Sequence, residues 1–126
     1  MNKKIFLILS IIYALFLIFI FSGEVCYRLE VFNRAVTFNP LNAEYRSARG
    51  DIRDLKAAIE FDPLTPAYHM YYGLALLEDL PGDKFSAQMQ LRLARKEISD
   101  AARLKPYSRL YQKIYADYSA WINSQF

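Results

Sequence analysis

An unbroken apolar run opens the chain. Residues 5–21 carry no charge, and only one serine and one tyrosine hydroxyl interrupt their series of Ile, Leu, Phe and Ala. Extended to Gly23, the run makes a helix of about 28 Å, close to the roughly 30 Å thickness of a bilayer's hydrocarbon core. We therefore predict that residues 1–23 form an N-terminal transmembrane anchor.

A cleaved secretory signal is the alternative, because a positive amino end followed by an apolar core is typical of both. The stretch that follows the run, residues 21–26, offers no A-x-A-like cleavage site. A cut after Ser22 or Gly23 would place Ile20 or Phe21 where a small residue is required. The sequence therefore favours an anchor that is retained.

Charge at the two ends of the run predicts its orientation. Lys3 and Lys4 precede it, whereas the two acids and two arginines of residues 24–34 cancel. Positive flanks stay on the cytoplasmic side. We therefore expect a single-pass protein of the cell inner (plasma) membrane, with a cytoplasmic N-terminus and a periplasmic or otherwise extracytoplasmic C-terminal domain.

Beyond the anchor the apolar residues recur with helical spacing. Val25, Leu29, Phe32 and Val36 fall at i, i+4, i+7 and i+11, which predicts that residues 24–41 continue the membrane helix outward. Residues 42–126 then form a separate domain of about five helices. No strand pattern occurs along the chain, so the predicted fold class is all-α.

Within the domain, capping signals and apolar stripes place the helices. Tyr45, Ala48, Ile52, Leu55 and Ile59 form a first stripe. Thr65 followed by Pro66 is a typical helix start, and that helix runs to about Asp79. Asp83 is placed to cap a helix over 84–104. Finally, a nearly continuous aromatic and aliphatic stripe runs from Tyr107 to Ile122.

A phrase of the form A-x-x-[FL]-x-P-[LY]-x-x-x-Y occurs three times. Its copies begin at Ala35, Ala58 and Ala101, and their prolines are Pro40, Pro63 and Pro106. A small residue allows two helices to approach closely, and the proline ends the helix because it lacks an N–H and restricts the residue before it. A new helix with an aromatic residue in its first turns follows at once. The phrase therefore predicts the end of one helical unit and the start of the next.

These residues resemble tetratricopeptide repeats, whose pattern is W-x2-L-G-x2-Y, then A-x3-F, then a proline. His69, Tyr72, Gly73 and Leu76 fall in the tryptophan, leucine, glycine and tyrosine slots of the first helix, and Ala94, Ile98 and Ala101 fill the small, large and small slots of the second. The resemblance covers residues 31–122 and contains one full unit, since the three prolines are 23 and 43 residues apart and the family's repeat is about 34. It implies a short right-handed stack of helical hairpins.

Charge and reactive side chains point away from catalysis. The domain has an acidic half, residues 44–83, followed by a basic half, residues 84–113, which suggests internal pairing or a dipolar surface. With one histidine, His69, and one cysteine, Cys26, the chain offers no zinc or haem set of its own. No nucleotide-binding or nucleophile motif occurs. We expect no enzyme activity, no cofactor, no metal, no small-molecule substrate and no nucleic-acid partner.

Exposed apolar positions are the candidate partner site. The resemblance implies binding through the concave face of the first helices, where Met70, Leu74 and Leu77 lie. The last helix carries Tyr111, Tyr115, Tyr118 and Trp121, a stripe that either caps the stack or docks on a partner or membrane surface.

The leading functional prediction is a non-catalytic, membrane-anchored protein–protein interaction module, an accessory or assembly subunit of a larger membrane complex. An anchored maturation or export factor that transiently holds client polypeptides is the alternative, similar to the tetratricopeptide proteins of cytochrome c biogenesis or envelope polysaccharide assembly. An enzyme whose site is completed by a partner chain is the remaining one.

Overall fold

Seven helices make up the protein in a computed structural model that describes residues 3–126. They are α1 (Lys3–Arg28), α2 (Phe32–Phe38), α3 (Ala43–Arg49), α4 (Ile52–Phe61), α5 (Pro66–Glu78), α6 (Lys84–Leu104) and α7 (Arg109–Asn123). No strand occurs among the described residues. The predicted all-α class, a long apolar N-terminal helix followed by a helical stack, is confirmed. The first two residues of the predicted anchor lie outside the described part.

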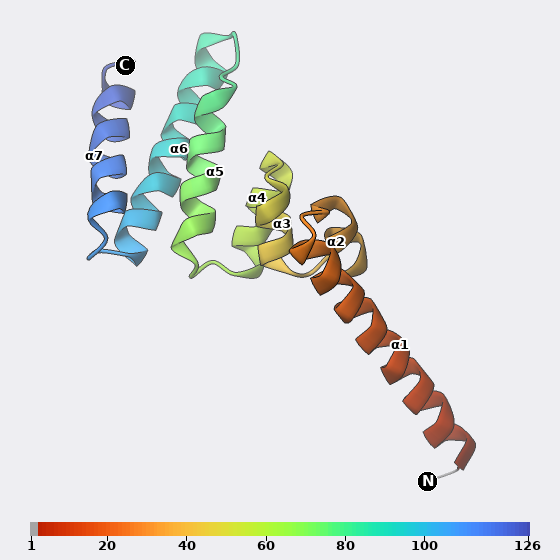
Figure 1. Cartoon of the computed structure of the whole chain (residues 1–126). Coiled ribbons are helices and arrows are strands. Elements are labelled where there is room, and N and C mark those ends of the chain that lie inside the picture. Colours follow the sequence, from red (N-terminus) through yellow and green to blue (C-terminus); the bar gives the residue numbers. More distant parts are fainter. Residues whose placement is uncertain (1–2) are drawn as a thin grey trace.

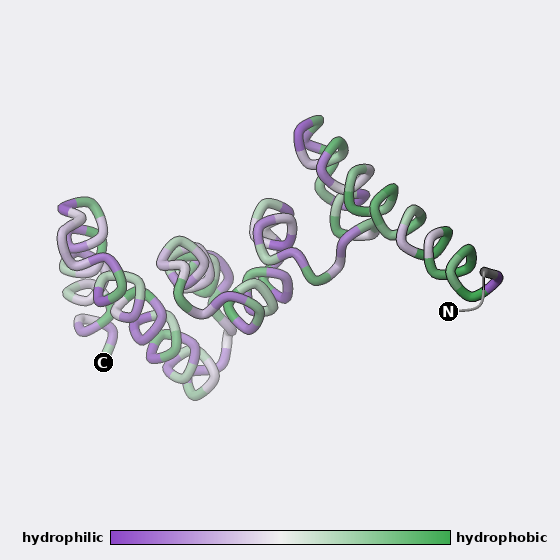
Figure 2. The backbone as a smooth tube through the Cα atoms, turned by 90° about the horizontal axis from the view of Figure 1, so that it is seen from below, coloured by the Kyte–Doolittle hydropathy of each residue, from purple (hydrophilic) through white to green (hydrophobic). Residues whose placement is uncertain are grey.

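Helix α1 projects away from the stack (Figure 1) and is apolar along most of its length (Figure 2). Its large side chains from Ile5 to Phe19 are all exposed, between 47% and 62%. Within residues 3–126 it is the one helix long and apolar enough to span a membrane. A signal sequence near the N-terminus meets the same criterion.

The chain reverses direction after α1, and the prediction that residues 24–41 continue the membrane helix outward is wrong beyond Arg28, where α1 ends. Glu30 adopts a left-handed conformation with φ of 58°. The N–H of Glu30 donates to the carbonyl of Tyr27 at 3.0 Å, and the N–H of Val31 donates to that of Cys26 at 2.9 Å. These two bonds form a Schellman motif, which closes a helix end. Helix α2 then folds back along α1, and the rings of Phe38 and Phe19 meet edge to face with centroids 5.8 Å apart.

Replacing Glu30 by glycine should stabilise this reversal. A non-glycine residue in the left-handed region costs about 1–2 kcal/mol, and Glu30→Gly removes most of that cost. We expect a gain of about 1 kcal/mol in the free energy of unfolding of the α1–α2 hairpin, measured by amide hydrogen exchange of the full chain in detergent micelles. Leu29→Gly is the matched control, because Leu29 has a negative φ, and it should destabilise. Equal effects of the two changes would contradict the assignment.

The remaining helices form antiparallel hairpins, α3 with α4 and α5 with α6, followed by α7 (Figure 1). The predicted helix over 84–104 is confirmed as α6, and Asp83 caps it by accepting from the N–H of Ser86 at 2.8 Å. The stripe from Tyr45 to Ile59 is divided into two helices because Gly50, with φ of 77°, ends α3.

Each copy of the repeated phrase builds the same junction between helices. The alanines Ala35, Ala58 and Ala101 are each 0% exposed, and each carbonyl accepts the N–H of the residue just after its helix. Those three residues share φ between −143° and −131° and ψ between 64° and 83°. The residue two after each proline is an N-cap with φ near −80° and ψ near 110°: Asn42, Thr65 and Ser108. The phrase therefore encodes one structural unit three times.

Helix α3 packs on α1 where Gly23 lets it approach. A Cβ atom at Gly23 would lie 3.1 Å from the ring of Tyr45. The Tyr45 ring stacks on Tyr27 at a centroid distance of 5.0 Å, and its hydroxyl donates to Glu24 at 2.9 Å. Burial and that hydrogen bond raise the pKa of Tyr45 to about 12. The membrane helix and the stack thus share a packed interface.

Candidate functional site

An apolar groove runs between α5 and α7. Helix α5 contributes Leu74, Leu77 and Glu78, and helix α7 contributes Asp117, Tyr118 and Trp121. The groove has a volume of about 470 Å³. Tyr118 and Trp121 remain 37% and 43% exposed, so their rings are available to another molecule. Four of the residues expected to bind a partner therefore meet at one surface.

The other three expected residues lie beneath that surface. Met70 is 2% exposed and packs with Ile98 and Ala101, while Tyr111 and Tyr115 are half-buried against the same cluster. Burial raises the pKa of Tyr111. These side chains form the core that holds α5, α6 and α7 together. Their contribution to partner binding stays a prediction, and any such contribution acts through the position of the helices.

Sequence reasoning did not identify the acidic rim of the groove. Glu78 and Asp117 are both exposed, and neither takes part in a hydrogen bond or ion pair with any described residue. Each lies four residues from an apolar groove residue on its own helix, Leu74 and Trp121. Residues four apart share a helix face, so that spacing was the signal available in the sequence.

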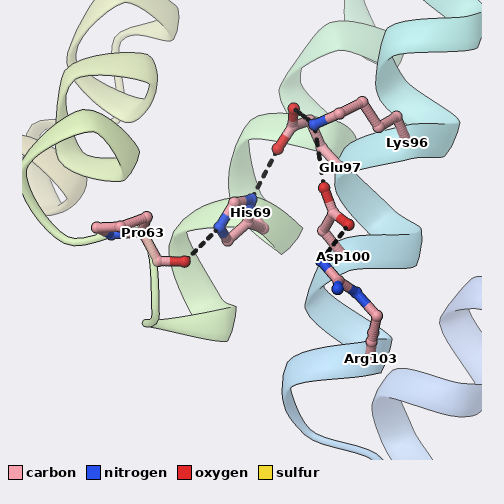
Figure 3. A network of polar contacts seen from close by, with 6 residues as sticks. All are labelled: Pro63, His69, Lys96, Glu97, Asp100 and Arg103. Carbon is pink, nitrogen blue, oxygen red and sulfur yellow. Dashed lines mark hydrogen bonds and ion pairs between the residues drawn. The ribbon is translucent and has the colours of Figure 1, made fainter.

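A polar network ties α5 to α6 on the other side of the core (Figure 3). His69 Nε2 donates to the carbonyl of Pro63 at 2.9 Å, because a carbonyl only accepts. His69 Nδ1 lies 2.7 Å from Glu97 Oε2, and both residues are buried. That second bond requires one further proton, carried by the ring or by the carboxyl group. The histidine therefore links the α4–α5 junction to α6.

Lys96 and Arg103 complete the network from the solvent side. Lys96 Nζ donates to Glu97 at 3.1 Å and to Asp100 at 3.0 Å, and Arg103 donates to Asp100 at 3.0 Å. Burial would raise the pKa of Asp100, but Lys96 and Arg103 outweigh that effect and hold it below its usual value. Both acids of the network therefore have cationic partners at the solvent side.

Three side chains of this network are close enough together to be considered as ligands of a metal ion. Donor atoms of His69, Glu97 and Asp100 lie within 4.8 Å of one another. The ammonium group of Lys96 already bonds to both carboxylates, and His69 Nδ1 is occupied by Glu97. A metal ion would have to displace both contacts. We assign the cluster to holding the two helices together.

Removing the histidine tests that assignment. His69→Ala leaves one oxygen of the buried Glu97 without its hydrogen-bond partner, and hydrogen bonds that involve a charged group contribute about 1.5–3 kcal/mol. We expect a loss of about 2 kcal/mol in chemical denaturation followed by Trp121 fluorescence. Lys96→Ala is the control, since the Lys96 side chain is 64% exposed and should cost no more than about 0.5 kcal/mol. A larger loss for Lys96→Ala than for His69→Ala would contradict this role.

No protein-family model matches the chain, and no curated protein matches it. The tetratricopeptide-like repeat thus stays a prediction from the repeated phrase, while the helical stack is what the structure shows.

Proposed function

We propose that the protein is a non-catalytic, membrane-anchored protein–protein interaction module, an accessory or assembly subunit of a larger membrane complex. Helix α1 holds it in the inner membrane with the N-terminus in the cytoplasm, and α2–α7 lie outside the cytoplasm. The observation that carries this proposal is the groove between α5 and α7, where exposed aromatic rings meet two unpaired carboxylates on a helical stack. Anchoring raises the local concentration of the groove near membrane partners.

Packing around the end of α1 supports a retained anchor. A signal peptidase would have to cut after Ser22 or Gly23, and both residues lie inside α1. Gly23 is buried beneath Tyr45. Cleavage would also remove Phe19, which packs on Phe38. The folded stack therefore includes the end of α1 in its own packing, as expected of a segment that stays part of the protein.

The chemistry of the groove defines its occupant. Leu74, Leu77 and the rings of Tyr118 and Trp121 offer an apolar surface, and aromatic residues of this kind are frequent anchors in protein interfaces. Glu78 and Asp117 add two negative charges. A segment with an apolar side chain flanked by lysine or arginine matches both features. We therefore assign the groove to such a segment of a membrane-complex subunit.

Site-specific photo-crosslinking in native membranes tests the proposal. The full chain carries a photoreactive phenylalanine analogue in place of Tyr118, and we expect one discrete adduct whose partner is a membrane-complex subunit. The double change Glu78→Lys with Asp117→Lys reverses the rim charge at exposed positions and should abolish the adduct. Glu60→Lys is the control, because Glu60 is an exposed acid on α4, outside the groove.

Three results would contradict the proposal. They are the absence of any adduct together with purification as a lone monomer, an adduct that survives the rim reversal, and an adduct lost equally in the Glu60→Lys control. A broad series of adducts with many unrelated polypeptides would instead support the client-holding alternative.

A further inference from the structure

The three copies of the repeated junction lie along one edge of the stack. Because successive helices are antiparallel, the α2–α3, α4–α5 and α6–α7 turns all fall on the same side (Figure 1). We name this side the junction edge, and its turns are residues 39–42, 62–65 and 105–108. The N-terminal end of α1 extends toward the same side. The turns α1–α2, α3–α4 and α5–α6 form the opposite edge.

Each turn of the junction edge presents one large apolar side chain to solvent. The residue after the proline is Leu41, Leu64 or Tyr107, and these are 71%, 75% and 98% exposed. Elsewhere in the phrase the alanines are fully buried. Three equivalent exposed apolar residues in a row are not explained by packing within the stack. A single exposed apolar residue is common on protein surfaces, but here one recurs at the same position of three successive turns along one edge.

The contact between α1 and α2 sets the level of this edge relative to the bilayer. Helix α2 runs back along α1 until Phe38 meets Phe19, and Phe19 belongs to the apolar run. Leu41 follows three residues after Phe38 in the chain. The first junction therefore lies beside the end of the segment that crosses the membrane, and the other two follow along the same edge (Figure 1).

Charge differs between the two edges in the direction that a bilayer favours. The opposite-edge turns carry Glu30, Asp51, Asp79 and Asp83 and no basic residue. The junction turns contain one acid, Asp62, whose carboxylate accepts from the hydroxyl of Thr65 at 2.6 Å and from a backbone N–H. Anionic lipid headgroups would repel the acidic opposite edge. They would not repel the junction edge, which carries little negative charge.

Basic residues flank the most exposed aromatic ring. Tyr107 lies between the exposed Lys105 and Arg109. Tyrosine is enriched at the level of lipid headgroups, where its ring and hydroxyl face different environments. Lysine and arginine are attracted to anionic lipid headgroups at a membrane surface. This group is suited to the outer layer of a phospholipid bilayer.

From these observations we infer that the junction edge lies on the surface of the membrane that α1 crosses, with Leu41, Leu64 and Tyr107 among the lipid headgroups. The inference rests on the proposed anchoring by α1. Contact at three turns holds the stack on the bilayer and fixes the height and direction of the α5–α7 groove above it. The groove then faces partners that project from the same membrane.

Spin-label accessibility of the full chain in liposomes tests this inference. Single cysteines are placed at Leu64→Cys and Tyr107→Cys on the junction edge, with Phe16→Cys as the anchor reporter and Phe85→Cys as control, all in a Cys26→Ser background. Phe85 is the matched control because it is also apolar and 75% exposed but lies in the first turn of α6, near the opposite edge. The liposomes contain phosphatidylcholine and phosphatidylglycerol. A spin label that collides often with oxygen lies among lipid chains. A spin label that collides often with a water-soluble nickel chelate is exposed to water.

We expect Phe16→Cys to favour oxygen, Leu64→Cys and Tyr107→Cys to lose access to the nickel chelate, and Phe85→Cys to retain it. If Phe16→Cys favours oxygen while either junction reporter is as accessible to the chelate as Phe85→Cys, the edge contact is overturned and the anchor stands. Loss of chelate access at Phe85→Cys also overturns it, because the shielding would not be specific to this edge. If Phe16→Cys is itself open to the chelate, the anchor and the edge contact both fail.

Discussion

Gly73→Ala should destabilise the α5–α6 hairpin although alanine is the better helix former. A Cβ atom at Gly73 would lie 2.7 Å from Ile98 Cγ1 and 3.1 and 3.2 Å from the backbone of Ala94 and Ile98. Backbone atoms of α6 cannot move without separating the helices. Overpacking of this kind costs about 1–3 kcal/mol, against about 1 kcal/mol gained in helix propensity. We expect a net loss of up to about 2 kcal/mol for Gly73→Ala, and a larger loss for Gly73→Val, in chemical denaturation followed by Trp121 fluorescence.

A double-mutant cycle tests the cause. Ile98→Ala alone removes a core side chain that is 1% exposed and should cost about 2–5 kcal/mol. Combined with Gly73→Ala it should cost less than the sum of the two changes, because the new methyl group occupies part of the space left by Ile98. Gly82→Ala is the control, since no atom lies within 4 Å of the position that its new methyl group would take, and it should change stability by less than about 0.5 kcal/mol. Additive effects in the cycle would contradict the steric explanation.

Gly73→Val should also weaken partner capture. Leu74 follows Gly73 in the chain and lines the groove, so separation of α5 from α6 shifts one wall of the groove relative to α7. In the crosslinking experiment we expect less adduct from the Gly73→Val chain even at temperatures where it remains folded.

Local chemistry in the sequence was sufficient to predict most helix boundaries. The proline, the small alanine and the capping residue act within a few positions of one another, and the three junctions show that their effect is the same in each copy. Asp83 caps α6 as expected, and α5 begins at Pro66, because capping and the proline restriction depend on neighbouring backbone groups. The hydroxyl of Thr65 makes no capping hydrogen bond and donates to Asp62 instead. Such signals need no knowledge of the rest of the fold.

Two chain reversals were not predicted, for different physical reasons. Glu30 is left-handed without being glycine, so no residue type marks the end of α1, and the apolar spacing through Val36 continues across the turn. At Gly50 the apolar stripe also continues, and glycine ends the helix there. Gly73, ten residues after its proline like Gly50, lies inside α5 and serves packing. The roles of Gly50 and Gly73 therefore differ only through their surroundings in the fold, since Gly73 packs against α6, whereas a Cβ atom at Gly50 would meet nothing within 4 Å.

The groove was predictable in part. Helical spacing selects Leu74, Leu77, Tyr118 and Trp121, and the structure brings them together. Helical spacing does not indicate how deeply a side chain is buried. It therefore selected Met70 as well, which is buried. The junction edge could not be deduced from the phrase alone, since the exposure of Leu41, Leu64 and Tyr107 follows from how the hairpins stack.

The buried carboxylate of Asp54 should be the most sensitive charge in the α3–α4 hairpin. Its side chain is 2% exposed, and it accepts hydrogen bonds from Arg49 on two sides and from Arg46 at 3.0 Å. Arg46 also donates to the carbonyl of Pro40 at 2.6 Å. Replacing both arginines by methionine leaves an uncompensated buried charge, which costs about 3–5 kcal/mol.

Adding Asp54→Leu to Arg46→Met and Arg49→Met should recover most of that loss. Apolar residues of similar volume often replace a buried ion pair at no net cost, because the desolvation of the charges is removed with their attraction. Repeat-like stacks transmit stability mainly between neighbouring units, so the measurement is amide hydrogen exchange of α3 and α4, with α6 as internal reference. The double variant should lose protection in α3 and α4 while α6 changes less, and the triple variant should regain it. If the triple variant stays as unstable as the double, the arginines act through packing and the buried charge is not the cause.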